Sequence, residues 1–388
     1  MKTIKLKDFT DAKTRREFLE KKFDISLENI AKFSFAEEDT ANRNIENLIG
    51  AAQIPLGVAG PVKLKTKNSK LGTYYIPLAT TEGALVASIS RGCKVIESSG
   101  GAKVFVENVG MSRGPVFKCK SLQECMETEA WIEENLKSLA KLAESTSSHL
   151  KLLKAEYKVV SKNLFVRLSF DTEDAMGMNM VTIATEVIVQ EIEKKTNARC
   201  VSLAGNFDVD KKPSWLNFIE GRGKKIWAEV VVPKKVVSET LKTTPEKIVE
   251  VVKSKTHLGS IMSGSLGFNS HFANIIAAIF IATGQDPAHV VEGSMGVTDS
   301  EVEKNGDLYF SIYLPSLIVG VVGGGTSLPT QKEALKILGV KNSVEFSGVI
   351  AHAILAGELS LIASLAQGSL ATAHQKLGRK GGKAKSQI

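Results

Sequence analysis

Apolar residues recur along this 388-residue chain at helical and at strand-like spacings, and the pattern is clearest between residues 114 and 203. The elements predicted there are a strand at 116–120, a helix at 121–144, strands at 155–160 and 164–170, a helix at 174–194 and a strand at 199–203. Ser121 and Glu124 form a capping box at the start of the first helix. The order β-α-β-β-α-β predicts a ferredoxin-like small domain inserted into a larger one.

The flanking segments predict an α+β protein with two further units. Residues 1–50 have the pattern of short charged helices, and the glycines and prolines of 50–61 indicate turns. The later elements predicted are a strand at 73–78, a helix at 82–98, a strand at 226–232, helices from 245 and at 259–283, a strand at 308–314, a buried helix at 346–367 and a short terminal helix with His374. We therefore expect a helical domain at 1–50, a large mixed domain at 51–113 and 204–388, and the small domain at 114–203.

Composition narrows the class of protein. Hydrophobic residues make up 43% and charged residues 24%, as in globular proteins. The four cysteines form no Cys-x-x-Cys pair, which argues against a disulfide framework or a zinc site and favours a reducing cytosol. The apolar stretches are too short, or carry Pro315, His352 or Glu358, so no membrane span is expected. The net charge of +8 fits nucleic acid, an anionic cofactor or a solvated basic tail.

The common catalytic sequence motifs are absent or lie in the wrong structural context. The sequence contains no Gly-x-Gly-x-x-Gly, no phosphate-binding P-loop and no His-Glu-x-x-His. One Gly-x-Ser-x-Gly occurs at 110–114, but Pro115 and a strand follow it, whereas a hydrolase elbow requires a helix. We interpret this segment as a loop, and any dinucleotide must be held by something other than a Rossmann turn.

Residues 174–180 carry the most unusual motif. Asp174 can cap the predicted helix, and Gly177 lets a phosphate or another backbone approach its positive end. Taken alone, the motif also fits a capped helix with Met176 and Met180 in the core. The glycine run 323–325 requires an unusual backbone or a close ligand.

Several short motifs follow one another in a specific order. They are Glu46–Ala51, Ile54–Pro61, Thr80–Gly83, Asp174–Met180, Gly205-Asn206, Asp210–Pro213, Gly221–Lys224, Gly284–Asp286, Gly323–Gly325, Ala356–Ser360 and His374. Together they resemble the catalytic region of hydroxymethylglutaryl-CoA (HMG-CoA) reductases over about residues 40 to 380. The Met-Gly-Met-Asn-Met form at 176–180 resembles the eukaryotic and archaeal branch.

The resemblance implies reduction of HMG-CoA to mevalonate and CoA with two hydrides from NADPH. It implies a catalytic set of Glu82, Lys211, Asp286 and His374. Lys211 suits an oxyanion, Asp286 could hold Lys211 and keep Glu82 protonated, and Glu82 could then donate a proton. His374 suits protonation of the CoA thiolate, because imidazolium has an ordinary pKa of about 6.5 against about 8.5 for a thiol.

The resemblance also implies the binding residues. Those expected at the dinucleotide are Asp174, Met176, Gly177, Met178 and Asn179. Those expected at the acyl-CoA substrate are Arg113, Asn206, Lys212, Lys255 and Asn274. No metal is implied. A homodimer or homotetramer with shared active sites is expected, with no nucleic-acid or membrane partner. The N-terminal membrane region of animal members is missing here, which favours a cytoplasmic enzyme.

Two positions depart from the family pattern. Lys380 stands where members regulated by phosphorylation carry a serine, so no such switch is expected. Ser148 stands where members that prefer NADPH carry an arginine, which leaves NADH possible. Lys151, Lys154 and His149 are the nearby cations that could contact the 2′-phosphate instead.

Two other functions compete with this interpretation. One is a basic binding module on an old enzyme fold, with nucleic acid as an example of its ligand. The other is an acyl-CoA reductase for a different acid, because the sequence fixes the acyl group only by resemblance.

Overall fold

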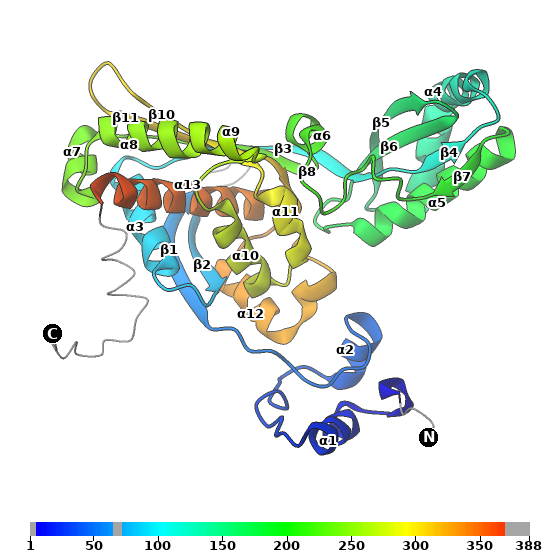
Figure 1. Ribbon diagram of the computed structural model, residues 1–388, viewed down its shortest axis with the longest axis horizontal. Coiled ribbons are helices and arrows are strands. Elements are labelled where there is room, and N and C mark those ends of the chain that lie inside the picture. Colours follow the sequence, from blue (N-terminus) through cyan, green and yellow to red (C-terminus); the bar gives the residue numbers. More distant parts are fainter. Residues whose placement is uncertain (1–4, 65–71, 369–388) are drawn as a thin grey trace.

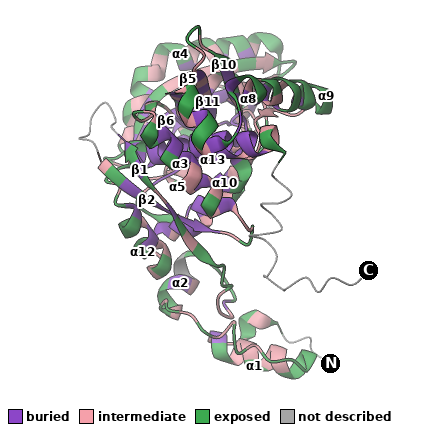
Figure 2. Ribbon diagram, turned by 90° about the vertical axis from the view of Figure 1, so that its left-hand side faces the viewer, coloured by how far each residue is buried: buried purple, intermediate pink, exposed green. Residues whose placement is uncertain are grey.

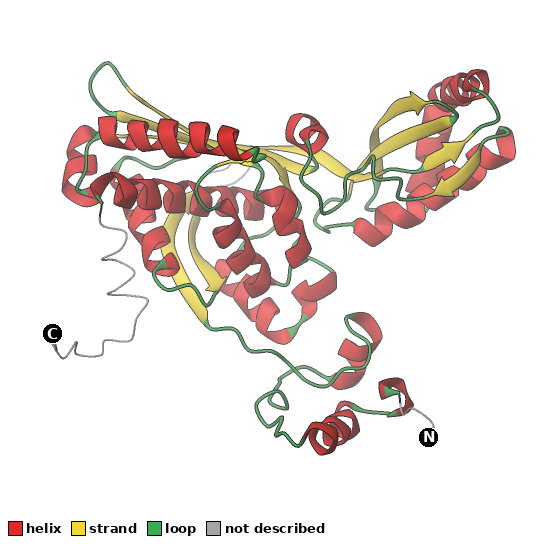
Figure 3. Ribbon diagram, viewed as in Figure 1, coloured by secondary structure: helices red, strands yellow, loops and turns green. Residues whose placement is uncertain are grey.

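The computed structural model describes residues 5–64 and 72–368. Figure 1 shows an elongated molecule with a helical N-terminal segment, a large central body and a small unit at the far end. Figure 3 shows that both the body and the small unit mix helices with strands. The predicted terminal helix with His374, and Lys380, lie outside the described residues.

The N-terminal segment and the first half of the body follow each other along the chain. Their elements are η1 (Leu6–Asp8), α1 (Ala12–Phe23), α2 (Glu37–Arg43), β1 (Leu56–Leu64), β2 (Gly72–Ala79), α3 (Leu85–Ser98) and β3 (Lys103–Arg113). β1 was not predicted, since glycine and proline interrupt its apolar pattern. α3 starts three residues later than predicted, because Ala84 before it is in the left-handed conformation, with a φ of 75°.

The small unit closely follows the pattern expected from the sequence. Its elements are β4 (Val116–Lys118), α4 (Leu122–Glu144), β5 (Lys151–Val160), β6 (Asn163–Asp171), α5 (Met178–Lys195) and β7 (Arg199–Ser202). The predicted N-cap is present, because Ser121 accepts a hydrogen bond from the Glu124 N–H. The reciprocal bond of a capping box is not formed as predicted, since Glu124 accepts from the N–H of Lys120 instead of that of Ser121. The strands lie in the order β7-β4-β6-β5.

The second half of the body returns from the small unit. Its elements are α6 (Trp215–Glu220), β8 (Gly223–Val232), α7 (Lys234–Val236), η2 (Val237–Leu241), α8 (Pro245–Val251), η3 (Val252–Gly259), α9 (Ser260–Ser263), β9 (Gly267–Phe268), α10 (Phe272–Thr283), η4 (Pro287–His289), α11 (Val290–Gly293), β10 (Gly296–Val302), β11 (Leu308–Leu317), η5 (Gly324–Ser327), α12 (Pro329–Leu338) and α13 (Ser343–Gln367).

One long sheet joins the body to the small unit. Within the described residues it has nine strands, in the order β7-β4-β6-β3-β8-β11-β10-β9 with β5 on β6. β3 pairs with β8 of the body over most of its length and with β6 of the small unit at Met111–Arg113. The segment 110–114, predicted as a loop, is therefore mostly strand, because Gly110 to Arg113 continue the pairing of β3.

The buried apolar residues form two clusters, one in the body and one in the small unit. α13 runs through the first cluster, and each of its residues from Glu345 to Ser360 is buried (Figure 2). Among the described helices, α13 is long and apolar enough to cross a membrane by length and composition, but 83% of that window is buried inside the protein. Its apolar character therefore fits the centre of a folded core.

The predicted continuous helix 259–283 is wrong. The segment is broken between α9 and α10, where Gly264 has a φ of 67° and β9 pairs with β10. The buried carboxylate of Glu358 on α13 accepts hydrogen bonds from the N–H groups of Ser270 and His271. These tertiary contacts satisfy the backbone at the break, and a pattern of small apolar residues cannot reveal them.

Candidate active site

Lys211 and Asp286 meet across the body of the protein. The Lys211 ammonium lies 2.7 Å from Asp286 Oδ2, and the two side chains are 38% and 29% exposed. Lys211 is in the loop between β7 and α6, whereas Asp286 follows α10 and caps η4 through the Ala288 N–H. The fold thus joins two predicted catalytic residues that are 75 positions apart in the sequence.

Asp286 is held in its charged form. Burial raises the pKa of its carboxyl, but the hydrogen bonds from Lys211 and the Ala288 N–H, with the charges of His289 and Lys211, outweigh burial, so that the pKa lies below its ordinary value. Lys211 is therefore paired with a carboxylate at neutral pH. The site presents an ammonium group that is fixed in place and still accessible to a substrate.

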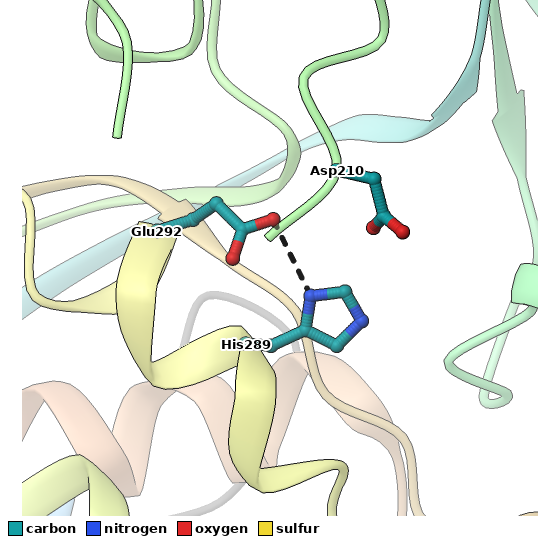
Figure 4. Close-up of side chains that lie close together, drawn as sticks. All are labelled: Asp210, His289 and Glu292. Carbon is teal, nitrogen blue, oxygen red and sulfur yellow. Dashed lines mark hydrogen bonds and ion pairs between the residues drawn. The ribbon is translucent and has the colours of Figure 1, made fainter. Parts of the chain in front are cut away.

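A buried network of charges lies behind this pair. Glu292, on α11, accepts a hydrogen bond from the Lys211 N–H and lies 3.0 Å from the Arg222 guanidinium. His289 points toward Glu292 with Nδ1, at 3.4 Å, as Figure 4 shows. Arg222 also contacts Asp210 at 2.8 Å. Glu292, Arg222 and His289 are all buried.

Asp210, His289 and Glu292 also have the donor types of a metal site, with ligand atoms within 4.8 Å of one another (Figure 4). However, one nitrogen of Arg222 contacts both Asp210 and Glu292. A guanidinium already supplies the positive charge that the two carboxylates require. We therefore interpret the cluster as an ion-pair network.

Glu82 lies in a second group of predicted site residues. Its carboxylate accepts a 2.6 Å hydrogen bond from the side-chain amide of Asn274, in the first turn of α10. Among the described residues, no hydrogen bond or ion pair joins Glu82 to Lys211 or Asp286. Asp286 was expected to lie beside Glu82 and to act on it by like-charge repulsion. Within one chain, the described residues give no direct interaction between the two carboxyl groups.

A pocket of about 630 Å³ brings together three segments that are distant in the sequence. Its lining residues are Ala175–Met180, Ile183, Gly284–Pro287, Gly320 and Val322–Thr326. Four residues predicted at the dinucleotide (Met176, Gly177, Met178 and Asn179) therefore share one cavity with the predicted catalytic Asp286. Gly177 ends this turn with a φ of 85° and precedes the first residue of α5.

The wall of the pocket requires glycine. A Cβ on Gly320 would lie 2.4 Å from the Met176 nitrogen, so only glycine allows the two backbones to approach this closely. Gly323 and Gly324 have φ values of 78° and 56°, with open space around them. Backbone N–H groups and the start of an 18-residue helix thus border an open cavity.

The sequence predicted that Asp174 caps the helix that follows it, and this prediction is wrong. α5 begins at Met178, and Asp174 Oδ1 instead accepts a 2.8 Å hydrogen bond from the N–H of Ser343, the first residue of α13. The Asp174 carbonyl accepts another from the Val321 N–H. Asp174 thus fixes the motif both to the glycine run and to α13. The contact with α13 is favourable, because a carboxylate is stabilised at the positive end of a helix.

Ser148 and Lys151 lie beside the loop that leads into this motif. Lys151, the first residue of β5, is paired in register with Asp171 at the end of β6. His149 Nδ1 lies 2.7 Å from the Glu173 carboxylate. The segment that resembles the 2′-phosphate contact of the family is therefore adjacent to residues 171–174.

The residues predicted at the acyl-CoA substrate are distributed over four places. Arg113, at the end of β3, lies 3.6 Å from the buried Asp208 carboxylate. Lys212 donates a 3.1 Å hydrogen bond to the side chain of Asn206, which places this pair in the same loop as Lys211. Asn274 contacts Glu82, and Lys255 lies in η3.

Arg222, His289 and Glu292 were not assigned a role from the sequence. Arg222 stands between two glycines in one of the motifs that carry the resemblance, and that signal could have identified it. His289 and Glu292 give no such signal, because a short segment with one histidine and one glutamate has the pattern of an exposed turn. Only the tertiary structure shows that both are buried.

The described residues thus form a mixed α/β fold with a lysine–aspartate pair at the edge of a glycine-lined pocket. The family model described as hydroxymethylglutaryl-coenzyme A reductase matches residues 11–379. The 3-hydroxy-3-methylglutaryl-coenzyme A reductase of Methanocaldococcus jannaschii is 52% identical, over 94% of this chain and 92% of that protein. The reductase 1 of Dictyostelium discoideum is 40% identical, over 94% and 68%.

The chain belongs to the hydroxymethylglutaryl-coenzyme A reductase family. Among solved structures, it is similar to a class II reductase from Streptococcus pneumoniae solved with NADPH in open conformations. The TM-score is 0.69 at 19% identity, over 92% of this chain and 97% of that one. This likeness confirms the mixed α/β fold.

Proposed function

We propose that this protein reduces HMG-CoA to mevalonate and CoA, using two hydrides from NADPH. The observation that carries the proposal is the Lys211–Asp286 ion pair at the edge of the pocket lined by Met176–Asn179. The NADPH in the Streptococcus pneumoniae structure and the names of the archaeal relatives support the same reaction.

The pocket fits a dinucleotide. Its volume lies within the range of ligand sites, about 300–1,000 Å³. The N-terminus of α5 and the glycine backbone provide N–H groups and a positive dipole for a pyrophosphate. Met176, Gly177, Met178 and Asn179 would hold the dinucleotide, with Asp174 fixing their loop, and the bound cofactor supplies the hydrides.

Lys211 stabilises the oxyanion that develops when the thioester carbonyl is reduced. Its ammonium is held by Asp286 rather than by water, so that little reorganisation is needed as charge develops. Asp286 stays ionised beside it, as its lowered pKa indicates. Lys212 and Asn206 lie in the same loop as Lys211, and Arg113 contacts Asp208 of that loop, so these three residues orient the acyl group.

Glu82 donates the proton that neutralises this oxyanion, and the Asn274 amide orients its carboxyl. His374 protonates the departing CoA thiolate. Lys255 contacts the CoA portion of the substrate. Because no hydrogen bond or ion pair joins the Glu82–Asn274 pair to the Lys211–Asp286 pair among the described residues, we propose a homodimer or homotetramer in which subunits share the active site.

The domain division follows the same proposal. The two separate apolar clusters support a small ferredoxin-like domain at 114–203 that binds the dinucleotide, next to a large substrate domain at 51–113 and 204–388. Residues 1–50 form a helical N-terminal domain. We also propose that the enzyme acts in the cytoplasm, without a membrane or nucleic-acid partner.

The direct test is an assay of NADPH oxidation that depends on HMG-CoA, with mevalonate identified by mass spectrometry. Mevalonate should form at a rate that rises with enzyme concentration. Reduction of another acyl-CoA, with HMG-CoA inactive, would support a reductase for a different acid. NADPH oxidation that ignores every acyl-CoA would refute the proposal.

A further inference from the structure

The loop that carries Lys211 is conformationally strained. Asn206, Val209 and Lys211 have φ values of 63°, 50° and 56°, in the left-handed region that favours glycine. A β-branched residue such as Val209 is seldom found there. Each such residue persists only where its surroundings fix it. Something must therefore hold this loop against relaxation.

Glu292 is the group that holds Lys211. It lies on α11 with no exposed surface, and its Oε1 accepts a 2.6 Å hydrogen bond from the Lys211 N–H. This bond joins positions 81 residues apart in the sequence. Nearby, the Asn217 amide donates to the Val209 carbonyl at 2.9 Å, which fixes the preceding part of the loop.

Glu292 is itself braced from two sides. The Arg222 guanidinium donates to the same Oε1 at 3.0 Å, and His289 Nδ1 lies 3.4 Å from it. Figure 4 shows the His289 imidazole below Glu292 and Asp210, joined to Glu292 by a dashed line. Arg222 is anchored in turn by Ser112 on β3, through its side chain at 3.0 Å. The carboxylate thus has one fixed position.

Both constraints on Lys211 come from one short segment. Asp286, at the start of η4, holds the ammonium, and Glu292, on α11, holds the backbone amide. His289 lies between them, with its unpartnered Nε2 3.9 Å from Asp286 Oδ2. Residues 286–292 therefore set the position of both ends of the lysine.

We propose that Glu292 is a positioning residue that holds Lys211 in its left-handed conformation and so places the ammonium for catalysis. The inference rests on the proposed role of Lys211. Without this hydrogen bond the loop relaxes toward ordinary φ values, and the ammonium moves away from the reacting carbonyl. A misplacement of about 1 Å typically costs about a hundredfold in rate.

Two variants separate position from charge. Glu292→Asp keeps the charge but withdraws the carboxylate by one methylene from the Lys211 N–H. Glu292→Gln keeps an oxygen at the same distance but removes the charge that faces Arg222. Glu345→Asp is a matched control, because Glu345 is also buried, on α13, where it bonds to Tyr74 away from Lys211. For each variant we would measure kcat, KM and the melting temperature.

The proposal predicts that Glu292→Asp lowers kcat at least tenfold, with KM changed less than about threefold. Glu292→Gln should keep kcat within about threefold of wild type, even if it melts earlier, and the control should keep kcat within about twofold. In a Lys211→Ala background, Glu292→Asp should cause no further loss of the residual rate.

Opposite results overturn the proposal. These are a greater loss of kcat in Glu292→Gln than in Glu292→Asp, a wild-type rate in Glu292→Asp, or a full additional loss in the Lys211→Ala background. If Glu292→Gln fails to fold, the test rests on Glu292→Asp, measured in the wild-type and in the Lys211→Ala background. Near-normal turnover of Lys211→Ala would instead refute the proposed function and leave the hydrogen bond itself unaffected.

Discussion

Lys211 and Asp286 illustrate what single residues reveal in this sequence. Both were predicted as catalytic from the motifs around them, and the structure places their charged groups 2.7 Å apart. Glu292, which holds the Lys211 backbone, was not predicted, because its importance depends on burial and on a contact 81 residues away. Sequence motifs therefore reveal reacting groups more easily than they reveal the groups that position them.

The two proposed chemical roles can be tested separately. Lys211→Ala should lower kcat by at least about a hundredfold, since loss of one oxyanion donor typically costs that much. Glu82→Gln should nearly abolish turnover, because an amide cannot donate the carboxyl proton. The measurement is steady-state turnover of purified protein, with circular dichroism as the folding control. Near-normal kcat in either variant would contradict its assigned role.

We propose that the preference between NADPH and NADH depends on residues 148–151, at the start of β5. Ser148 cannot give the bidentate contact of an arginine to a phosphate, but Lys151 can supply a point charge. We expect a modest, salt-sensitive preference for NADPH in kcat/KM. Lys151→Ala should narrow it and Ser148→Arg should widen it. A preference for NADH that neither substitution changes would show that this segment does not contact the 2′-phosphate.

At the scale of elements, helices and strands with regular periodicity were predicted well, whereas segments with irregular backbone were not. The helix at 121–144 was predicted to within a residue, because its cap and apolar face are local signals. The predicted helix at 259–283 is instead broken, and the break is stabilised by Glu358 from a distant helix. Long-range contacts of this kind leave no local pattern.

The packing of α3 on α13 gives a prediction about stability. A Cβ on Gly92 would lie 1.9 Å from the Ala356 carbonyl oxygen, so Gly92→Ala must push two buried helices apart. We expect a loss of about 1–3 kcal/mol or more. The control is Gly259→Ala, where the nearest atom would be 3.6 Å away. Thermal melts should show a large drop for the first and little change for the second; equal melting temperatures would contradict this packing.

On the scale of the whole molecule, one continuous sheet links two hydrophobic clusters, and the pocket lies where their loops meet. The sequence predicted two mixed units from their patterns, but not the sheet that joins them. β3 is the reason, because one strand pairs with both units and its glycine-containing end had the pattern of a loop. The pocket could be anticipated only through the family resemblance.

The buried histidine of α13, His352, is expected to make the stability of the whole protein depend on pH. Burial lowers the pKa of His352 to about 4 from an ordinary 6.5. Between these values the unfolded chain binds a proton that the folded chain does not, so stability should fall as pH drops from 6.5 to 4, by on the order of 3 kcal/mol. Denaturant melts would show this, and His352→Leu should flatten the slope. An unchanged slope in that variant would contradict the assignment to His352.

We propose that a thioester undergoes a four-electron reduction at the Lys211 site. The measurement that tests it most directly is the ratio of NADPH oxidised to CoA thiol released in a reaction that goes to completion with HMG-CoA. We predict two NADPH per thiol, with mevalonate as the product and no reaction above background with Lys211→Ala. One NADPH per thiol with an aldehyde as the final product, or full activity of the Lys211 variant, would contradict it.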